Sequence, residues 1–146
     1  KDVSSKFNFL LWRVTHNALP MDDRIQRIVG FLASRFYCCR EPKNEMVGHL
    51  FVDSDWSRRV WQAHGSFTGW KNQGGTLDDF FGLWFHGAGE RGPKRKGCAV
   101  ILMAGCWTIW KAQNNARHNK TTCSHTGITF KMRNTLLDLA CLCTDC

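Results

Sequence analysis

The 146-residue chain carries 20 Lys and Arg against 12 Asp and Glu, which gives a formal net charge of +8. Hydrophobic residues make up 43% of the chain and charged residues 22%, values that are typical of globular proteins and exclude a disordered segment. The positive balance favours contact with phosphate backbones without specifying a sequence, although many small soluble proteins are basic without binding nucleic acid.

The longest apolar run extends from Cys98 to Trp110 and is shorter than the roughly 18 residues that a membrane span requires, so we expect a buried helix there. No signal peptide is recognisable. Eight cysteines at irregular spacing then predict reduced thiols instead of a disulfide framework. We therefore expect an intracellular protein, nuclear or cytoplasmic, with no membrane partner. The first residue, Lys1, leads us to expect a piece of a longer reading frame.

Two helices are predicted at the start of the chain. The first is capped by Ser4 or Ser5 and runs to about Asn17, because Pro20 lacks the amide hydrogen that would continue it. The second spans residues 22–29, where two aspartates suit the positive end of the helix dipole.

Gly30 is predicted to close the second helix. The helical period is then lost: residues 36–42 resemble a strand that enters a turn, and residues 49–52 a second extended piece. Helical patterns return at residues 54–64, 77–85, 94–117 and 127–143. The sequence thus predicts a mainly α protein with a short irregular or β-like segment between helices.

Two of the later helices carry start signals. Asp53 or Ser54 is predicted to cap the helix that ends near His64. Thr76 and Asp79 form a variant of the capping box, in which the side chains three residues apart satisfy each other's backbone amides.

One segment has residues suited to a metal. Cys38 and Cys39 are followed by His49, whereas a structural zinc site needs four N or S ligands and commonly uses two spaced pairs. Neighbouring side chains seldom reach one ion from a single strand. From spacing alone, buried thiols near a hydrogen-bonded histidine are the better interpretation.

The densest basic cluster comprises Arg91, Lys94, Arg95 and Lys96. Cations at the start of a helix oppose the macrodipole, so local stability does not explain them. Three explanations stay open: contact with RNA or DNA backbone, nuclear import, and a solvated loop. Trp70 beside Lys71 would suit stacking on a single strand.

Catalytic patterns are absent from the sequence. Polymerase and nuclease centres need clustered carboxylates that hold two metal ions. The paired aspartates at residues 22–23 and 78–79 lie at predicted helix starts, where capping accounts for them. We therefore expect a chain that is not an enzyme on its own.

Several motifs occur in an order that resembles a known family, the zinc-binding domain of plant-type non-LTR (LINE) retrotransposon reverse transcriptases. They are residues 9–13 (FLLWR), 16–20 (HNALP), 23–24 (DR), 49–51 (HLF) and 57–61 (SRRVW). Residues 106–117 (CWTIWKAQNNAR) resemble a helix found downstream in the same elements.

The resemblance implies a zinc knuckle beside a polymerase domain. The family's four ligand positions fall on Phe36, Cys39, His49 and about Ser54, of which Phe36 and Ser54 are unsuited to zinc. Cys38 is a substitute candidate, and a C-terminal cysteine could complete the set. His16 belongs to the same signature and is interpreted as a packing or capping group.

We accordingly expect a reverse-transcriptase zinc-binding-like domain at residues 1–64 and a helical C-terminal extension at residues 65–146 that packs on it. The leading hypothesis is a non-catalytic module that assists nucleic-acid binding next to the polymerase. The alternatives are a structural or protein-interaction domain without metal, motivated by seven Trp, and a decayed fragment of a retroelement.

Overall fold

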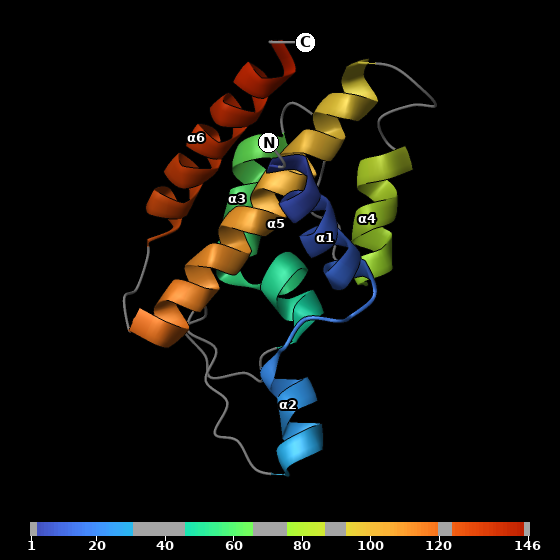
Figure 1. Ribbon diagram of the computed structural model, residues 1–146, viewed down its shortest axis with the longest axis vertical. Coiled ribbons are helices and arrows are strands. Elements are labelled where there is room, and N and C mark those ends of the chain that lie inside the picture. Colours follow the sequence, from blue (N-terminus) through green and yellow to red (C-terminus); the bar gives the residue numbers. More distant parts are fainter. Residues whose placement is uncertain (1–2, 31–45, 66–75, 87–92, 120–123, 145–146) are drawn as a thin grey trace.

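The computed structural model describes residues 3–30, 46–65, 76–86, 93–119 and 124–144 (Figure 1). Its elements are α1 (Val3–Thr15), α2 (Asp22–Val29), the π-helical turn η1 (His49–Asp53), α3 (Asp55–Gly65), α4 (Leu77–His86), α5 (Pro93–Asn119) and α6 (His125–Thr144). No strand occurs within these ranges, which confirms the mainly α class for the part of the chain that the structure describes.

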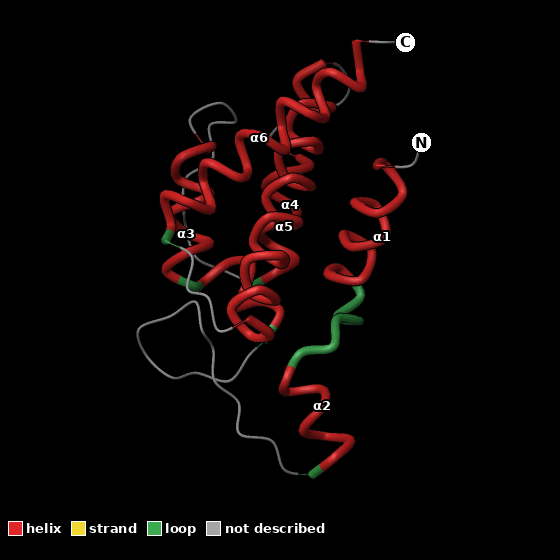
Figure 2. Tube along the Cα trace, turned by 60° about the vertical axis from the view of Figure 1, so that its left-hand side comes forward, coloured by secondary structure: helices red, strands yellow, loops and turns green. Residues whose placement is uncertain are grey.

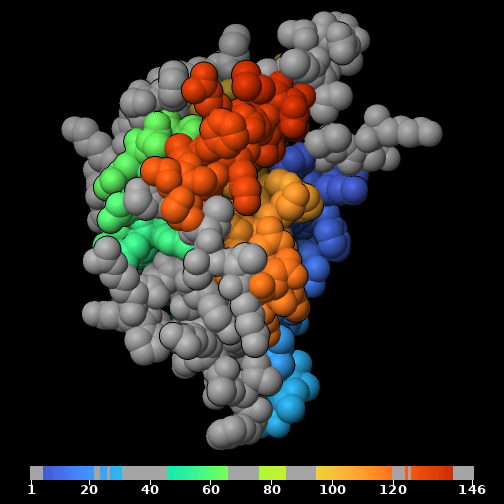
Figure 3. All heavy atoms as spheres, turned by 90° about the vertical axis from the view of Figure 1, so that its left-hand side faces the viewer, coloured from blue at the N-terminus to red at the C-terminus, as the bar shows by residue number. Residues whose placement is uncertain are grey.

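The long helix α5 is the centre of the molecule. It contacts α1, α3, α4, α6 and η1, and α6 packs in addition on α3. Figure 3 shows the face on which α6 lies across α3 and α5. Helix α2 lies at one end of the molecule, beyond the C-terminal end of α1 (Figure 2).

The ends of α1 differ from the prediction in two ways. The helix begins at Val3, so Ser4 and Ser5 lie in its first turn and do not cap it. It ends at Thr15, two residues early, because Asn17 adopts a positive φ of 49°. A left-handed residue just past the last turn is a common helix terminator, and asparagine tolerates it better than most residues.

Helix α2 and its end agree with the prediction. The helix spans Asp22–Val29, and Gly30 has a φ of 78°, a conformation that glycine adopts without steric cost. The prediction of extended structure at residues 49–52 is wrong: they form η1, closed by the amide of Ser54 donating to the carbonyl of His49 at 2.8 Å. A short apolar run fits a buried strand and a buried helix equally well, and here Leu50, Phe51 and Val52 all enter the core. The predicted strand at residues 36–42 lies outside the described residues.

The predicted caps of α3 and α4 are confirmed. The Ser54 hydroxyl accepts the amide of Ser57 at 3.0 Å at the start of α3. At α4, the amide of Thr76 donates to the Asp79 carboxylate at 2.9 Å and the amide of Asp79 donates to the Thr76 hydroxyl at 3.2 Å. The Thr76 amide, and second to it the Thr76 hydroxyl that donates to the same carboxylate at 2.8 Å, lower the pKa of Asp79. The last two predicted helices are also observed, each extending slightly further at both ends.

The apolar run of α5 is part of the core. Cys98, Leu102, Cys106 and Ile109 are all buried there. Among the described residues, no helix is both long enough and apolar enough to cross a membrane.

Trp61 is the focus of this core. It is fully buried, its indole Nε1 donates to the carbonyl of Phe51 at 2.6 Å, and its ring lies 5.1 Å from that of Phe80 and 5.4 Å from that of Trp84. The buried cluster includes residues of α1, η1, α3, α4, α5 and α6. The described core therefore continues across residue 64, and the domain boundary predicted there stays a prediction.

Gly105 of α5 lies directly against the Trp61 ring. A Cβ atom at Gly105 would overlap the Cη2 and Cζ3 atoms of Trp61, and it would lie 3.2 Å from the methyl group of Met132 on α6. At Gly97, one end of the same helix, a Cβ atom would meet nothing within 4 Å.

We predict opposite effects for alanine at these two glycines. Gly105→Ala should lower the free energy of unfolding by about 1–3 kcal/mol, because the ring and the helix must move apart. Gly97→Ala should raise it by up to about 1 kcal/mol, since alanine has the higher helix propensity. Urea denaturation of both variants measures the difference.

A third variant isolates the cause. In a Trp61→Leu background the added methyl group of Gly105→Ala should cost little, because the overlapping ring atoms are gone. Equal losses from Gly105→Ala in both backgrounds would contradict the contact with Trp61.

Candidate metal and nucleic-acid sites

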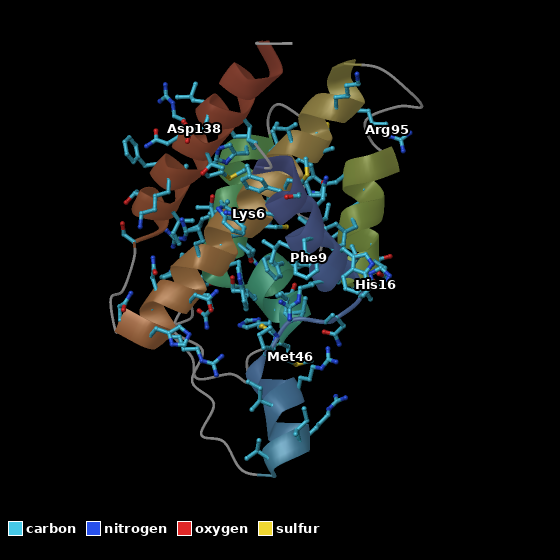
Figure 4. The ribbon with its side chains drawn as sticks, viewed as in Figure 1. Lys6, Phe9, His16, Met46, Arg95 and Asp138 are labelled. Atoms are coloured by element: carbon cyan, nitrogen blue, oxygen red, sulfur yellow. The ribbon has the colours of Figure 1, made fainter. Side chains whose placement is uncertain are left out.

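His49 is the described member of the predicted metal ligands. It begins η1, and its side chain is half-buried. Figure 4 labels Met46, three residues before it, in the lower half of the molecule near α2. Cys38, Cys39 and the family position Phe36 lie outside the described residues, so the pairing of His49 with these cysteines stays a prediction.

Ser54, the fourth family position, has a structural role. It is fully buried, its Oγ accepts the Ser57 amide, and the same Oγ is 2.9 Å from the Ser57 hydroxyl and 3.2 Å from the carbonyl oxygen of Leu50. The Ser57 hydroxyl in turn donates to the Ser54 carbonyl at 2.9 Å. Because the Ser54 hydroxyl already takes part in the helix cap and in buried hydrogen bonds, it is not suited to bind zinc.

The cysteines whose side chains the structure describes do not replace the missing zinc ligand. Cys98 and Cys106 are free and buried in α5, and burial raises the pKa of Cys106 far above its ordinary value. The C-terminal end of α6, which contains Cys141 and Cys143, lies at the opposite end of the molecule from α2, and the turn η1 lies between the two ends (Figure 1). Within the described ranges, no three His, Cys, Asp or Glu side chains are grouped as a metal site requires.

The structure separates the predicted basic cluster from His49. Arg95 and Lys96 are exposed in the first turns of α5, and Lys94 lies in the same first turn. Arg91 lies outside the described residues, as does the Trp70–Lys71 pair. Figure 4 shows Arg95 at the end of the molecule opposite Met46. Arg95, the labelled member of the basic cluster, therefore lies away from the segment that leads into η1.

Helix α1 displays a column of rings that the sequence did not predict. Phe9 is 60% exposed and Trp12 is 52% exposed. Their ring centroids are 6.3 Å apart with planes at 15°, and His16 stacks on Trp12 at 4.6 Å. The Nδ1 of His16 lies 2.9 Å from the carbonyl oxygen of Trp12, which confirms the capping role expected for this histidine. Phe9 and Trp12 are exposed because they occupy the face of α1 opposite Phe7, Leu10 and Val14, which enter the core.

A second feature missed by the sequence lies between α5 and α6. Trp107, Lys111 and Asn115 of α5 share a pocket with Lys131 and Asn134 of α6. The spacing of four residues along α5 could have indicated a common face, but only the fold brings α6 against it.

Comparison with known proteins bears on the first part of the chain. Residues 1–61 match the family model described as zinc-binding in reverse transcriptase. This segment is a reverse transcriptase zinc-binding domain. No curated protein and no solved structure matches the chain.

The reverse transcriptase zinc-binding segment covers α1, α2, η1 and α3 up to Trp61. It contains His49 and Ser54, and it ends at the tryptophan around which α4, α5 and α6 pack. Zinc binding is thus implied by the family, whereas the fourth ligand position of this segment is committed to the helix cap.

We predict that chelation of metal leaves the fold intact. Prolonged dialysis against EDTA should change neither the far-UV circular dichroism nor the melting temperature, because buried side chains hold η1 and α3 to the core. Ser54→Ala should cost about 0.5–2 kcal/mol through loss of the cap, and Cys39→Ser should cost less.

Elemental analysis of zinc completes the experiment. One equivalent of zinc per chain, together with loss of helical signal in both Cys39→Ser and His49→Ala, would contradict this prediction. That result would mean that ligands outside the described residues complete a structural site.

Proposed function

We propose that the chain is a non-catalytic module of a retroelement polyprotein, of the plant-type non-LTR class, that assists nucleic-acid binding next to the polymerase. The match of residues 1–61 to the reverse transcriptase zinc-binding family is the observation that carries the proposal. The family name supplies the polymerase context, and the net charge of +8 supplies the affinity for phosphate.

The distribution of charge supports this function. Every Lys and Arg whose side chain the structure describes is exposed or half-buried, so all of them can approach an anionic strand. Arg95 and Lys96 at the start of α5 belong to the cluster that the sequence singles out, together with Arg91 and Lys94. Because long-range attraction adds over all exposed charges, we expect a sequence-independent contribution to binding.

Three of the described carboxylates lie at helix starts. Asp55, Asp78 and Asp79 occupy the first turns of α3 and α4, where they favour the helix dipole, and Asp79 completes a capping box. These positions support a binding role in preference to two-metal catalysis.

We predict salt-sensitive binding of RNA or DNA. Fluorescence anisotropy with labelled oligonucleotides should give an affinity that falls linearly with salt on logarithmic axes, with a slope of roughly −0.7 per phosphate contact for single strands. Replacing both Arg95 and Lys96 by Gln should weaken binding and make this slope shallower by roughly 1.4, which is roughly 0.7 for each lost contact.

Two controls accompany this measurement. Circular dichroism should show unchanged helical content, because both side chains are exposed on the first turns of α5. Absence of any binding at low ionic strength would rule out the nucleic-acid part of the proposal.

Docking onto the polymerase domain is a second candidate function, favoured by the column of rings on α1. Phe9 and Trp12 expose large apolar surfaces within the reverse transcriptase zinc-binding segment. Exposed aromatic pairs of this kind are enriched where proteins meet. The partner would be the polymerase domain of the same polyprotein.

For this second function we predict self-association of the isolated chain that depends on the ring column. Light scattering after size exclusion should show a rising mean mass with concentration, and Phe9→Ser with Trp12→Ser should abolish the rise without altering the melting temperature. A wild-type chain that stays monomeric over the whole concentration range would speak against docking through α1.

A further inference from the structure

A pocket of about 290 Å³ opens between α5 and α6, outside the reverse transcriptase zinc-binding segment. Its walls combine one indole, two lysines, two asparagines, two threonines and an alanine. The lining residues are Trp107, Thr108, Lys111, Ala112 and Asn115 of α5, with Lys131, Asn134 and Thr135 of α6.

Several polar side chains face this pocket in the seam between α5 and α6. The apolar side of α6 enters the core through Ile128 and Met132, which are fully buried. Lys131, next to Met132, instead lines the pocket from α6, and Lys111 lines it from α5. None of the described lining residues is acidic, so the two ammonium groups give the pocket a positive potential.

Trp107 provides a fixed apolar wall. Its ring packs against that of Phe7 on α1, with centroids 5.2 Å apart and planes at 57°. The Nζ atom of Lys111 lies 5.8 Å from the centroid of the same indole. Packing against α1 thus holds the aromatic surface, while the flexible lysine stem can direct its charge toward a ligand in the pocket.

We propose that this pocket binds one nucleotide of a single-stranded RNA or DNA. Lys111 and Lys131 hold the phosphate from opposite walls, the Trp107 indole packs on the base, and the Asn115 and Asn134 amides hydrogen-bond the sugar or the base edge. The inference rests on the nucleic-acid binding proposed above and assigns it a location.

The size and the aromatic wall of the pocket favour a single strand over a duplex. At about 290 Å³ it lies just below the usual range of roughly 300–1,000 Å³ for small-molecule sites, which suits one nucleotide unit. An aromatic wall can stack only on a base that is not already stacked and paired in a duplex. A duplex would contact the exposed lysines at the rim without entering the pocket.

The test compares two pairs of substitutions that remove equal charge. Lys111→Gln with Lys131→Gln alters the pocket, and Arg58→Gln with Arg133→Gln alters two exposed arginines that do not line it. Each pair lowers the formal charge from +8 by two, to +6. Binding of a labelled oligouridylate and of an RNA duplex of the same length is measured by anisotropy at low salt.

The pocket variant should lose about tenfold in affinity for oligouridylate, and the arginine variant less than about threefold, because only the first loses direct phosphate contacts. Both pairs should affect the duplex equally. Lys111→Arg with Lys131→Arg should recover most of the affinity, since the charges are retained. Circular dichroism checks that each variant is folded. The same comparison can be made with single substitutions, Lys131→Gln in the pocket against Arg133→Gln outside it.

Three outcomes overturn the inference. Equal losses of oligouridylate affinity from the two pairs would mean that the pocket lysines contribute only general charge. An equal tenfold loss of duplex affinity in the pocket variant would mean that the pocket has no preference for a single strand. In both cases the proposed nucleic-acid function survives. No binding of either RNA by the wild-type chain would remove the pocket and the proposed function together.

Discussion

The contact between Trp61 and Gly105 fixes how α3, α4, α5 and η1 pack together. The indole occupies the volume that a Cβ atom of residue 105 would need, so α3 and α5 approach each other at a distance that only glycine permits. The same ring packs on Phe80 and Trp84 of α4, and its nitrogen donates to the carbonyl of Phe51 in η1. A change in the size of either partner is therefore transmitted to four helical elements, because a close-packed core has no free volume to absorb it.

This packing bears on the metal that the family implies. Zinc organises small domains whose apolar cores are too small to fold alone. Here η1 and α3 are already joined to α4, α5 and α6 through buried side chains, and the hydroxyl of Ser54 bonds to backbone and to Ser57. The serine at the fourth ligand position has thus become part of the helix cap. The packing of α4, α5 and α6 on η1 and α3 is the physical basis for expecting that the fold does not depend on an ion.

Charge and aromatic surface are distributed over separate faces. The column formed by Phe9, Trp12 and His16 lies on α1, the basic residues Arg95 and Lys96 lie at the start of α5, and the lysines of the pocket lie between α5 and α6. A module that meets both a protein partner and a nucleic-acid strand benefits from such separation, because the two partners do not compete for one surface. The pocket has a concave shape and an indole wall in addition to charge, whereas the α5 start offers charge alone.

The sequence by itself determined the mainly α class, the bounds of α2 and most of α3 to α6, and the cap at Thr76, because periodicity and capping depend on neighbouring residues. It limited the cap of α3 to Asp53 or Ser54, and the structure shows Ser54. It also identified the reverse transcriptase zinc-binding family from ordered motifs. It assigned residues 49–52 wrongly to extended structure, since a short apolar run has no period, and it did not predict the exposed ring column of Phe9 and Trp12. Only the tertiary structure decided that Trp61 meets Gly105, 44 positions along the chain, and that Lys111 and Lys131 share a pocket. Such contacts arise from helices distant in sequence, and no local pattern specifies which faces they turn toward one another.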